Sequence, residues 1–427
     1  MKQILKVTIL SGLYTFLKML AGFIIGKVIA LYTGPSGMAM MGQIQSVVTV
    51  LNGLATAPAG NGLVRYTAEN HEQGINACVP WWRACVRVSI LIMLIVIPIF
   101  MVFSQKISYY LFENAQYYWL IILACGLIPC SIVNTLVASV LNGQQRYREY
   151  ITLGMLSVIA STVVMIILIV FYGLKGALIA TACNNAIAGI VLYFCCRKEV
   201  WLRLTYWFGN VEKEKLAGIT KYTLMALTTA IAMPLALLFV RNILITEQNW
   251  DQAGQWQAVW KISEVYLSVI TVALSTYFLP RLAVIRDGVM MKKEVNSILI
   301  YIMSLAAVMA LGIYIFRDVI ITVLFTEEFR NARNLFLYQL IGDVIKVAGF
   351  TYAYPILAQG KMKIYISSEI IFSVSFVLLV QYFVKNYGIQ GANIGYLINY
   401  SLYLLFTFVY TNFINSQSLV KKRGDSL

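Results

Sequence analysis

Charged residues are scarce in this sequence. Asp, Glu, Lys and Arg make up only 12% of its 427 residues, whereas hydrophobic residues make up 60%. A soluble domain has about 25% charged residues, so the composition excludes a soluble globular protein. Apolar runs of roughly 20 residues or more recur from end to end, and each is long enough to cross a bilayer as a helix. The sequence therefore predicts an all-α polytopic membrane protein.

Signals of catalysis and metal binding are also missing. The chain has one histidine, His71, and its seven cysteines show no zinc-ligand spacing. Neither an HExxH pair nor a nucleophile elbow occurs, and GFIIGK (22–27) lacks the spacing of a phosphate-binding loop. We therefore expect no enzyme activity, no cofactor and no metal.

The apolar runs predict twelve transmembrane helices joined by short loops. We expect the spans at residues 4–33, 37–64, 84–104, 116–141, 151–172, 175–196, 218–246, 254–280, 296–325, 333–359, 362–384 and 388–413. The first segment has no small-residue cleavage site, so we do not expect a signal peptide. The outer loops are too short for the catalytic loop of a membrane glycan polymerase or ligase.

The net charge of +15 follows membrane topology and does not indicate a nucleic-acid partner. The N-terminus, the even-numbered loops and the C-terminal tail hold 22 Lys and Arg, whereas the odd-numbered loops hold six. An excess of this kind marks the cytoplasmic side of a membrane protein. We therefore expect a multi-pass protein with both termini in the cytoplasm.

An internal repeat divides the chain into two halves. LNGQQRYREYITLGMLSVIA (141–160) resembles LAQGKMKIYISSEIIFSVSF (357–376), and YGLKGALIA (172–180) resembles YGIQGANIG (387–395). The matched glycines, Gly143 with Gly360 and Gly173 with Gly388, are 217 and 215 residues apart. We therefore expect two parallel six-helix bundles, an N-terminal one at 1–210 and a C-terminal one at 211–427. Such repeats bind substrate at their interface and move it by alternating access, as transporters do.

Eight charged side chains are predicted to lie inside spans, where charge is costly and usually functional. The five bases are Lys18, Lys27, Arg241, Lys261 and Lys346, and the three acids are Glu264, Asp343 and Glu369. A surplus of bases favours an anionic substrate group such as a pyrophosphate. We expect the bases to line a cationic substrate-binding cavity and the acids to serve in coupling or charge pairing.

Each of these charges has a structural alternative. Lys27 and Arg241 can anchor helix ends at a membrane interface, and Glu369 can belong to the cytoplasmic end of its span. Lys261 with Glu264, and Asp343 with Lys346, have the i,i+3 spacing of helical ion pairs. The stretch QLIGDVIKVAG (339–349) therefore leaves open whether Asp343 pairs with Lys346 or across the cavity.

Two further segments stand out in the spans. WQAVWKISEVYLS (256–268) is rich in aromatic residues, which either stack on sugar rings or lie at a membrane interface. Trp256, Trp260 and Tyr266 are its candidates for glycan contact. NGLATAPAGNG (52–62) contains Pro58 among glycines and asparagines, which predicts a helix break that lines a cavity or permits close helix packing.

Four long stretches carry a resemblance to a known family. They are LKMLAGFIIGKVIALYTGPSG (17–37), YTLMALTTAIAMPLALLFVRNIL (222–244), WDQAGQWQAVWKISEVYLSVITVALSTYFLPRL (250–282) and QLIGDVIKVAGFTYAYPILAQGKMKIYISSEI (339–370). Over nearly its whole length the chain resembles the Wzx family of lipid-linked oligosaccharide flippases. That family is part of the multidrug/oligosaccharidyl-lipid/polysaccharide exporter (MOP) superfamily.

The resemblance implies a V-shaped exporter fold in the bacterial inner membrane. It implies a flippase that moves undecaprenyl-pyrophosphate-linked oligosaccharide units from the cytoplasmic to the periplasmic leaflet by alternating access. Membrane lipids, the polysaccharide polymerase and the chain-length regulator are the implied partners, and proton coupling is left open. The family's membrane charges match Lys18, Lys27, Arg241, Asp343, Lys346 and Glu369, with Glu264 where the family has aspartate.

The identity of the glycan is less defined by the resemblance. Lys261 departs from the family pattern, and similarity is weaker over residues 68–88. These departures favour the O-antigen unit of lipopolysaccharide biosynthesis as cargo. The alternatives are lipid III of enterobacterial common antigen synthesis and, in a different functional class, a cation-coupled export of small molecules.

Overall fold

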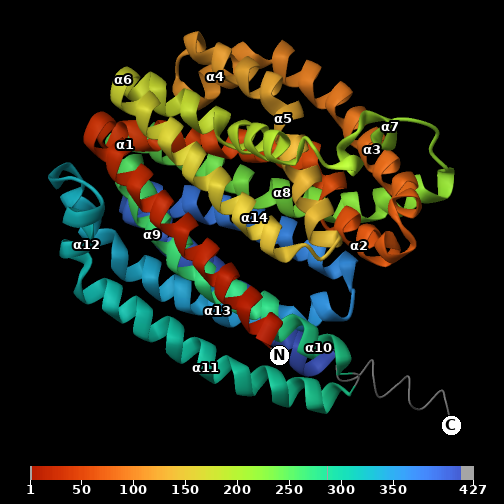
Figure 1. Ribbon diagram of the computed structural model, residues 1–427. Coiled ribbons are helices and arrows are strands. Elements are labelled where there is room, and N and C mark those ends of the chain that lie inside the picture. Colours follow the sequence, from red (N-terminus) through yellow and green to blue (C-terminus); the bar gives the residue numbers. More distant parts are fainter. Residues whose placement is uncertain (1, 286, 415–427) are drawn as a thin grey trace. The chain divides into compact units, whose positions relative to one another are not determined.

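The protein is helical throughout residues 2–285 and 287–414, the part of the chain that a computed structural model describes (Figure 1). Within these residues, nine helical segments are long and apolar enough to cross a membrane. Two of them, Leu10–Gln73 and Tyr147–Cys196, have 64 and 50 residues, and a single crossing needs only about 20. The chain is thus a multi-pass membrane protein. That it has twelve spans stays a prediction. The basic C-terminal tail (421–423) lies outside the described residues.

Two compact units make up the fold. Unit 1 comprises Met1–Thr33 and Met40–Leu238, and unit 2 comprises Gly34–Ala39 and Phe239–Leu427. The first long helix therefore contributes one short segment to unit 2. The bundle boundary between residues 210 and 211 was predicted from the sequence repeat and stays a prediction.

Unit 1 is built from long helices with α5 packed along α6. Its elements are α1 (Lys2–Thr56), the 3₁₀ turn η1 (Ala57–Ala59), α2 (Asn61–Asn70), the 3₁₀ turn η2 (His71–Gln73), α3 (Ile75–Val102), α4 (Ser104–Phe112), the 3₁₀ turn η3 (Ala115–Tyr117), α5 (Tyr118–Gly143), α6 (Tyr147–Cys196), the 3₁₀ turn η4 (Val200–Leu202), α7 (Leu204–Trp207) and most of α8 (Lys213–Glu247). Small residues permit the close packing. A Cβ on Gly189 of α6 would lie 2.0 Å from the Cys130 carbonyl oxygen of α5.

Two glycines interrupt the longest helices at the predicted span boundaries. Gly34 in α1 has φ +62° and is followed by Pro35, and Gly173 in α6 has φ +54°. Positive φ is readily available only to glycine, and proline cannot continue the preceding helix. The boundaries predicted between 33 and 37 and between 172 and 175 therefore coincide with real breaks.

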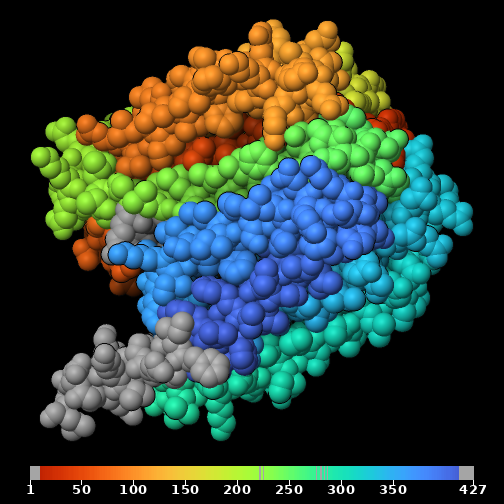
Figure 2. All heavy atoms as spheres, turned by 180° about the vertical axis from the view of Figure 1, so that it is seen from behind, coloured from red at the N-terminus to blue at the C-terminus, as the bar shows by residue number. Residues whose placement is uncertain are grey.

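In unit 2, helix α13 packs against most of the other helices. The elements of this unit are α9 (Trp250–Ala273), the π-turn η5 (Leu274–Phe278), α10 (Leu279–Val284), α11 (Gly288–Ile315), α12 (Arg317–Leu324), the 3₁₀ segment η6 (Glu327–Leu335), α13 (Phe336–Ala358), α14 (Met362–Tyr387), α15 (Gln390–Val409) and the π-turn η7 (Tyr410–Ile414). Helix α15 packs on α13 and α14, and α11 packs on α13. Figure 2 shows an outer surface of this unit, formed by the blue helices of the C-terminal third beside teal α11.

The predicted repeat recurs in the backbone at matching junctions. Gln145 (φ +57°) and Gly360 (φ +64°) occupy the same left-handed position in the turns that follow α5 and α13. Gly173 and Gly388 (φ +58°) form a second matching pair. Both pairs are 215 residues apart, since 360 − 145 and 388 − 173 each give 215. The sequence match of Gly143 with Gly360 was therefore displaced by two residues, because a glycine is matched most readily to a glycine.

Several predicted span limits were wrong. The span predicted at 84–104 begins earlier, since α3 starts at Ile75, and the span predicted at 296–325 starts at Gly288 and breaks at Phe316. The helices continue beyond the apolar runs on which the prediction rested, over INACVPWWR (75–83) in α3 and GVMMKKEV (288–295) in α11. The break at Pro58 was predicted correctly: the α-helix changes into the turn Ala57–Ala59.

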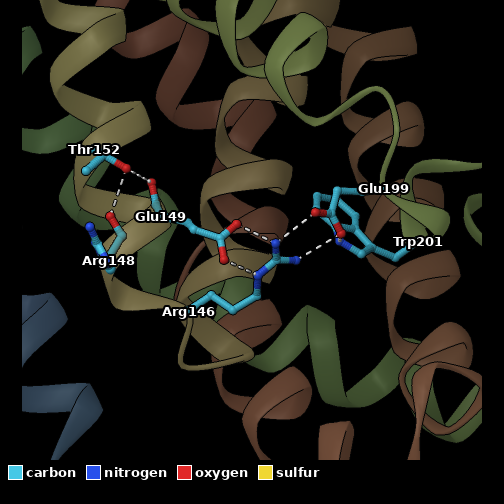
Figure 3. A network of polar contacts seen from close by, with 6 residues as sticks. All are labelled: Arg146, Arg148, Glu149, Thr152, Glu199 and Trp201. Carbon is cyan, nitrogen blue, oxygen red and sulfur yellow. Dashed lines mark hydrogen bonds and ion pairs between the residues drawn. The ribbon is translucent and has the colours of Figure 1, made fainter.

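The segment that follows α6 and contains Glu199 and Trp201 is held in unit 1 by a polar network (Figure 3). The guanidinium of Arg146, in the turn between α5 and α6, donates to both carboxylate oxygens of Glu199 at 2.9 and 2.8 Å and also bonds Glu149. Trp201 Nε1 donates to Glu199 at 2.9 Å. The hydrogen bonds from Arg146 lower the pKa of the Glu199 carboxyl below its usual value. This segment is therefore an ordered part of unit 1.

Candidate functional site

The predicted site residues are divided between the two units. Lys18 and Lys27 lie on α1 in unit 1, and Arg241, Lys261, Glu264, Asp343, Lys346 and Glu369 lie in unit 2. A single cationic cavity formed by all of them stays a prediction.

Asp343 is the polar centre of unit 2. Its side chain is fully buried on α13, and both carboxylate oxygens accept hydrogen bonds. Oδ2 accepts from Ser263 Oγ (2.6 Å) and Tyr266 Oη (2.8 Å) of α9, whereas Oδ1 accepts from Tyr396 Oη (2.7 Å) of α15 and Gln339 Nε2 (3.2 Å). A buried carboxylate is tolerated only when it is satisfied in this way. Asp343 thereby joins three helices.

Lys346 lies one turn further along α13, in a cage of aromatic rings. Its Nζ is 4.8 Å from the centroid of Tyr400 and 5.5–5.6 Å from those of Trp260, Tyr396 and Phe350. These distances are typical of cation–π contacts, which hold an ammonium without neutralising it. Among the residues that the structure describes, Lys346 forms no ion pair with a carboxylate. Asp343 and Lys346 therefore lie on one turn of α13 without forming an ion pair with each other.

Lys261 and Glu264 behave differently from that pair. Lys261 Nζ lies 3.8 Å from a Glu264 carboxylate oxygen, and Trp260 Nε1 donates to Glu264 at 3.0 Å. Both charged side chains are partly exposed. The structural pairing considered for this i,i+3 spacing is therefore formed.

Arg241 and Glu369 occupy the remaining predicted positions in unit 2. Arg241 is 3% exposed on α8, and its Nε donates to Gln257 Oε1 of α9 at 2.7 Å. Such burial does not fit the alternative of an exposed interface anchor. Glu369 lies half-buried on α14. Their roles toward a substrate stay predictions.

The three candidates for glycan contact are inside unit 2. Trp256, Trp260 and Tyr266 are 1%, 3% and 6% exposed, and the rings of Trp256 and Trp260 are 5.2 Å apart. Trp260 contacts the Lys346 cation and Tyr266 bonds Asp343. Trp260 and Tyr266 thus help to position the two charged groups, and glycan contact of all three residues stays a prediction.

Unit 1 contains a polar cavity of about 550 Å³ that includes Lys18. Tyr14, Lys18, Ala21 and Ile25 line it from α1, with the i, i+4, i+7, i+11 spacing of one helical face. Lys27 does not line this cavity, because it lies on a different face of α1. The Lys18 ammonium is 4.1 Å from the centroid of the Tyr14 ring.

Sequence reasoning missed most of the polar lining of this cavity. Five asparagines contribute to it: Asn61, Asn134, Asn142, Asn184 and Asn185. The signal that was available is Asn184–Asn185, two adjacent amides in the middle of an apolar span, where polar groups are costly. Pro58 also acts here, because the helix break before Gly60 places Gly60 and Asn61 on the cavity wall.

Comparison with known proteins was made for both sequence and structure. No family model matches the chain. It is 28% identical over 404 residues to the lipid III flippases of Escherichia coli (strain K12) and Shigella flexneri, covering 93% of this chain and 95% of each relative. The resemblance inferred from the sequence is thereby confirmed.

Solved structures show the same fold at lower identity. An inward-facing conformation of a multidrug resistance MATE family transporter of the MOP superfamily aligns with a TM-score of 0.71 and 16% identity, covering 95% of this chain and 96% of that one. An outward-facing conformation of such a transporter aligns with a TM-score of 0.68 and 14% identity, covering 97% and 96%. The relatives are flippases and the solved structures are transporters. The chain is therefore a homologue of the lipid III flippases and has the same fold as these MATE family transporter structures.

Proposed function

We propose that this protein flips lipid-linked, pyrophosphate-bearing oligosaccharide units across the bacterial inner membrane. The homology to lipid III flippases over nearly the whole chain supports the class of cargo. The observation that carries the proposal is Lys346, a cation held in unit 2 by aromatic faces and forming no ion pair with a carboxylate among the described residues. An anionic pyrophosphate would supply the negative charge to pair with this lysine.

The rest of the mechanism follows the expectations from the sequence. Twelve spans in two parallel halves, 1–210 and 211–427, work by alternating access, with both termini in the cytoplasm and transport toward the periplasm. Asp343 positions Lys346 by fastening the α13 turn to α9 and α15. Proton coupling through Asp343, Glu264 or Glu369 is part of this proposal, and a flux that ignores a pH gradient in proteoliposomes would contradict it.

A lipid III-like unit is the cargo that we favour. The O-antigen unit was expected because of Lys261 and the weaker similarity over residues 68–88. The relatives found by sequence are nevertheless lipid III flippases, and Lys261 forms an ion pair with Glu264. Mass spectrometry of the lipid-linked glycan that accumulates in a deletion strain distinguishes the two cargoes. Accumulation of an O-antigen unit would identify that unit as the cargo, as we expected from the sequence.

The cation is tested by complementation of a strain that lacks its own flippase. Lys346→Ala removes a charged contact to phosphate worth about 1.5–3 kcal/mol, so surface glycan should be restored about ten- to a hundredfold more slowly. Lys346→Arg keeps the charge and should retain part of the activity. Lys385→Ala, at an exposed ion pair with Glu247 in the same unit, is the matched control and should behave as wild type.

Two outcomes would contradict the proposal. One is full restoration of surface glycan by Lys346→Ala at wild-type membrane levels, which would remove the cationic mechanism. The other is drug resistance conferred on a pump-deficient strain without any restoration of glycan, which would favour the small-molecule exporter suggested by the fold of the MATE structures.

A further inference from the structure

The cavity of unit 1 has an unusual polar lining. Its five asparagines, defined above, come from α2, α5 and the second half of α6. No side-chain hydrogen bond joins any of them to another residue in the part of the chain that the structure describes. The hydroxyl groups of the same wall are different, since Ser139 donates to the Ala59 carbonyl and Ser157 to the Leu153 carbonyl. The five amides therefore keep their hydrogen-bonding capacity for an occupant of the cavity.

Five such amides at one place need an explanation. Each asparagine offers two donors and one acceptor oxygen. Four of the five are half-buried and Asn61 is exposed, so their amides face the open space of the cavity and not a packed core. In a membrane-spanning bundle an unpaired polar group costs several kcal/mol when it meets hydrocarbon. The clustering of these amides on one cavity therefore indicates that the cavity is built for a polar occupant.

The chemistry of the wall indicates which occupant fits. Sugar hydroxyls donate and accept at once, as amides do, so each asparagine can form a reciprocal pair with them. Lys18 adds one positive charge to the same cavity, and Tyr14 and Tyr150 add ring faces. The volume of about 550 Å³ lies within the roughly 300–1,000 Å³ usual for small-molecule sites. A neutral, hydroxyl-rich group next to an anion matches all of these features.

We propose that the unit 1 cavity is a glycan subsite that binds the phosphate-linked sugar of the cargo, with the asparagine amides on its hydroxyls and Lys18 beside its phosphate. This inference rests on the proposed flippase function and adds the part of the chain that recognises the sugar. It assigns recognition to amides of unit 1 in addition to the aromatic residues of α9. A hydrophobic cation suits the cavity poorly, because Lys18 repels it and amides do not solvate it.

The test uses the full chain in nanodiscs, so that no glycoside detergent occupies the cavity. Two radiolabelled probes are compared, glucose 1-phosphate and inorganic phosphate. Asn184→Leu combined with Asn185→Leu removes two amides with little change in size. Binding of glucose 1-phosphate should weaken about tenfold, as the loss of one or two hydrogen bonds predicts, whereas binding of inorganic phosphate should not change.

Further variants keep the test decisive. Lys18→Ala should weaken both probes, and Asn386→Ala, whose amide bonds its own helix in unit 2, should weaken neither. Thermal unfolding shows whether the double variant is folded. If it is not, Asn134→Ser on α5 removes an amide from another helix of the same wall and should again weaken the sugar phosphate selectively.

The subsite and the proposed function can fail separately. Equal affinity of wild type for both probes, or unchanged affinity of the folded asparagine variants for glucose 1-phosphate, would overturn the glycan subsite. Complementation by the wild-type protein would leave the flippase function standing in that case. Conversely, a selective loss of sugar-phosphate binding with no complementation by wild type would support the subsite and refute the proposed cargo.

Discussion

Replacing Asp343 by asparagine tests how unit 2 is held together. The carboxylate accepts four hydrogen bonds, two on each oxygen, from α9, α13 and α15. Asparagine has almost the same shape but keeps only one of the two acceptor oxygens. The new NH₂ group is best placed at the Oδ1 position, where it faces Gln339 and Tyr396. The Tyr396 hydroxyl would then have to turn round to accept from it.

The expected cost follows from the strength of these bonds. Hydrogen bonds to a charged group contribute about 1.5–3 kcal/mol each and neutral ones about 0.5–1.5 kcal/mol. Part of the loss is recovered, because the Oε1 atom of Gln339 is buried without a hydrogen bond and can accept from the new amide after a flip. We therefore expect Asp343→Asn to destabilise the protein by about 2–4 kcal/mol, and Asp343→Leu, which leaves all four donors unpaired, by more.

Thermal unfolding in nanodiscs measures this loss as an apparent melting temperature. A domain of about 150–250 residues loses about 2–4 °C per kcal/mol, so Asp343→Asn should melt several degrees below wild type. Tyr396→Phe removes one donor but keeps the ring beside Lys346, and it should have a smaller effect. A melting temperature of Asp343→Asn equal to that of wild type would refute the role of a carboxylate as the common acceptor of these helices.

Two further predictions concern unit 1. The lowered pKa of Glu199 means that its bonds to Arg146 stabilise the fold above the unfolded-state pKa of about 4.3, and that this stabilisation disappears as the pH falls through the lower, folded-state pKa. Glu199→Gln should lower the free energy of unfolding by about 1 kcal/mol or less, because the pair is partly exposed. The resulting difference in melting temperature from wild type should shrink below about pH 4. A difference that grows on acidification would contradict this assignment. Gly189→Ala places a Cβ 2.0 Å from a backbone oxygen of α5 and should destabilise the α5–α6 packing by about 1–3 kcal/mol. Its control, Gly126→Ala, meets nothing within 4 Å and should not lower the melting temperature; equal losses in both variants would show that helix contact is not the cause.

Much of the fold could be predicted from the sequence because its causes are local. Span positions follow from apolar runs, and the breaks at Gly34, Pro58 and Gly173 follow from backbone conformations that only glycine or proline imposes. The first turns of α3 and α11 were missed, because Arg83 in one and Lys292, Lys293 and Glu294 in the other interrupt the apolar run. The repeat was found, but its register needed the backbone turns at Gln145 and Gly360.

The site shows the limit of such reasoning. The sequence alone determined that this is a membrane transporter-like chain, where its helices break, and that Lys18, Asp343 and Lys346 are costly enough at their depth to have a purpose. Only the tertiary structure decided that Asp343 bonds Ser263, 80 residues away, while Lys346 faces aromatic rings. It alone also gathered five asparagines around Lys18. The physical reason is that hydropathy and backbone preference act along the chain, whereas hydrogen bonds and cavities arise from residues that only packing brings together.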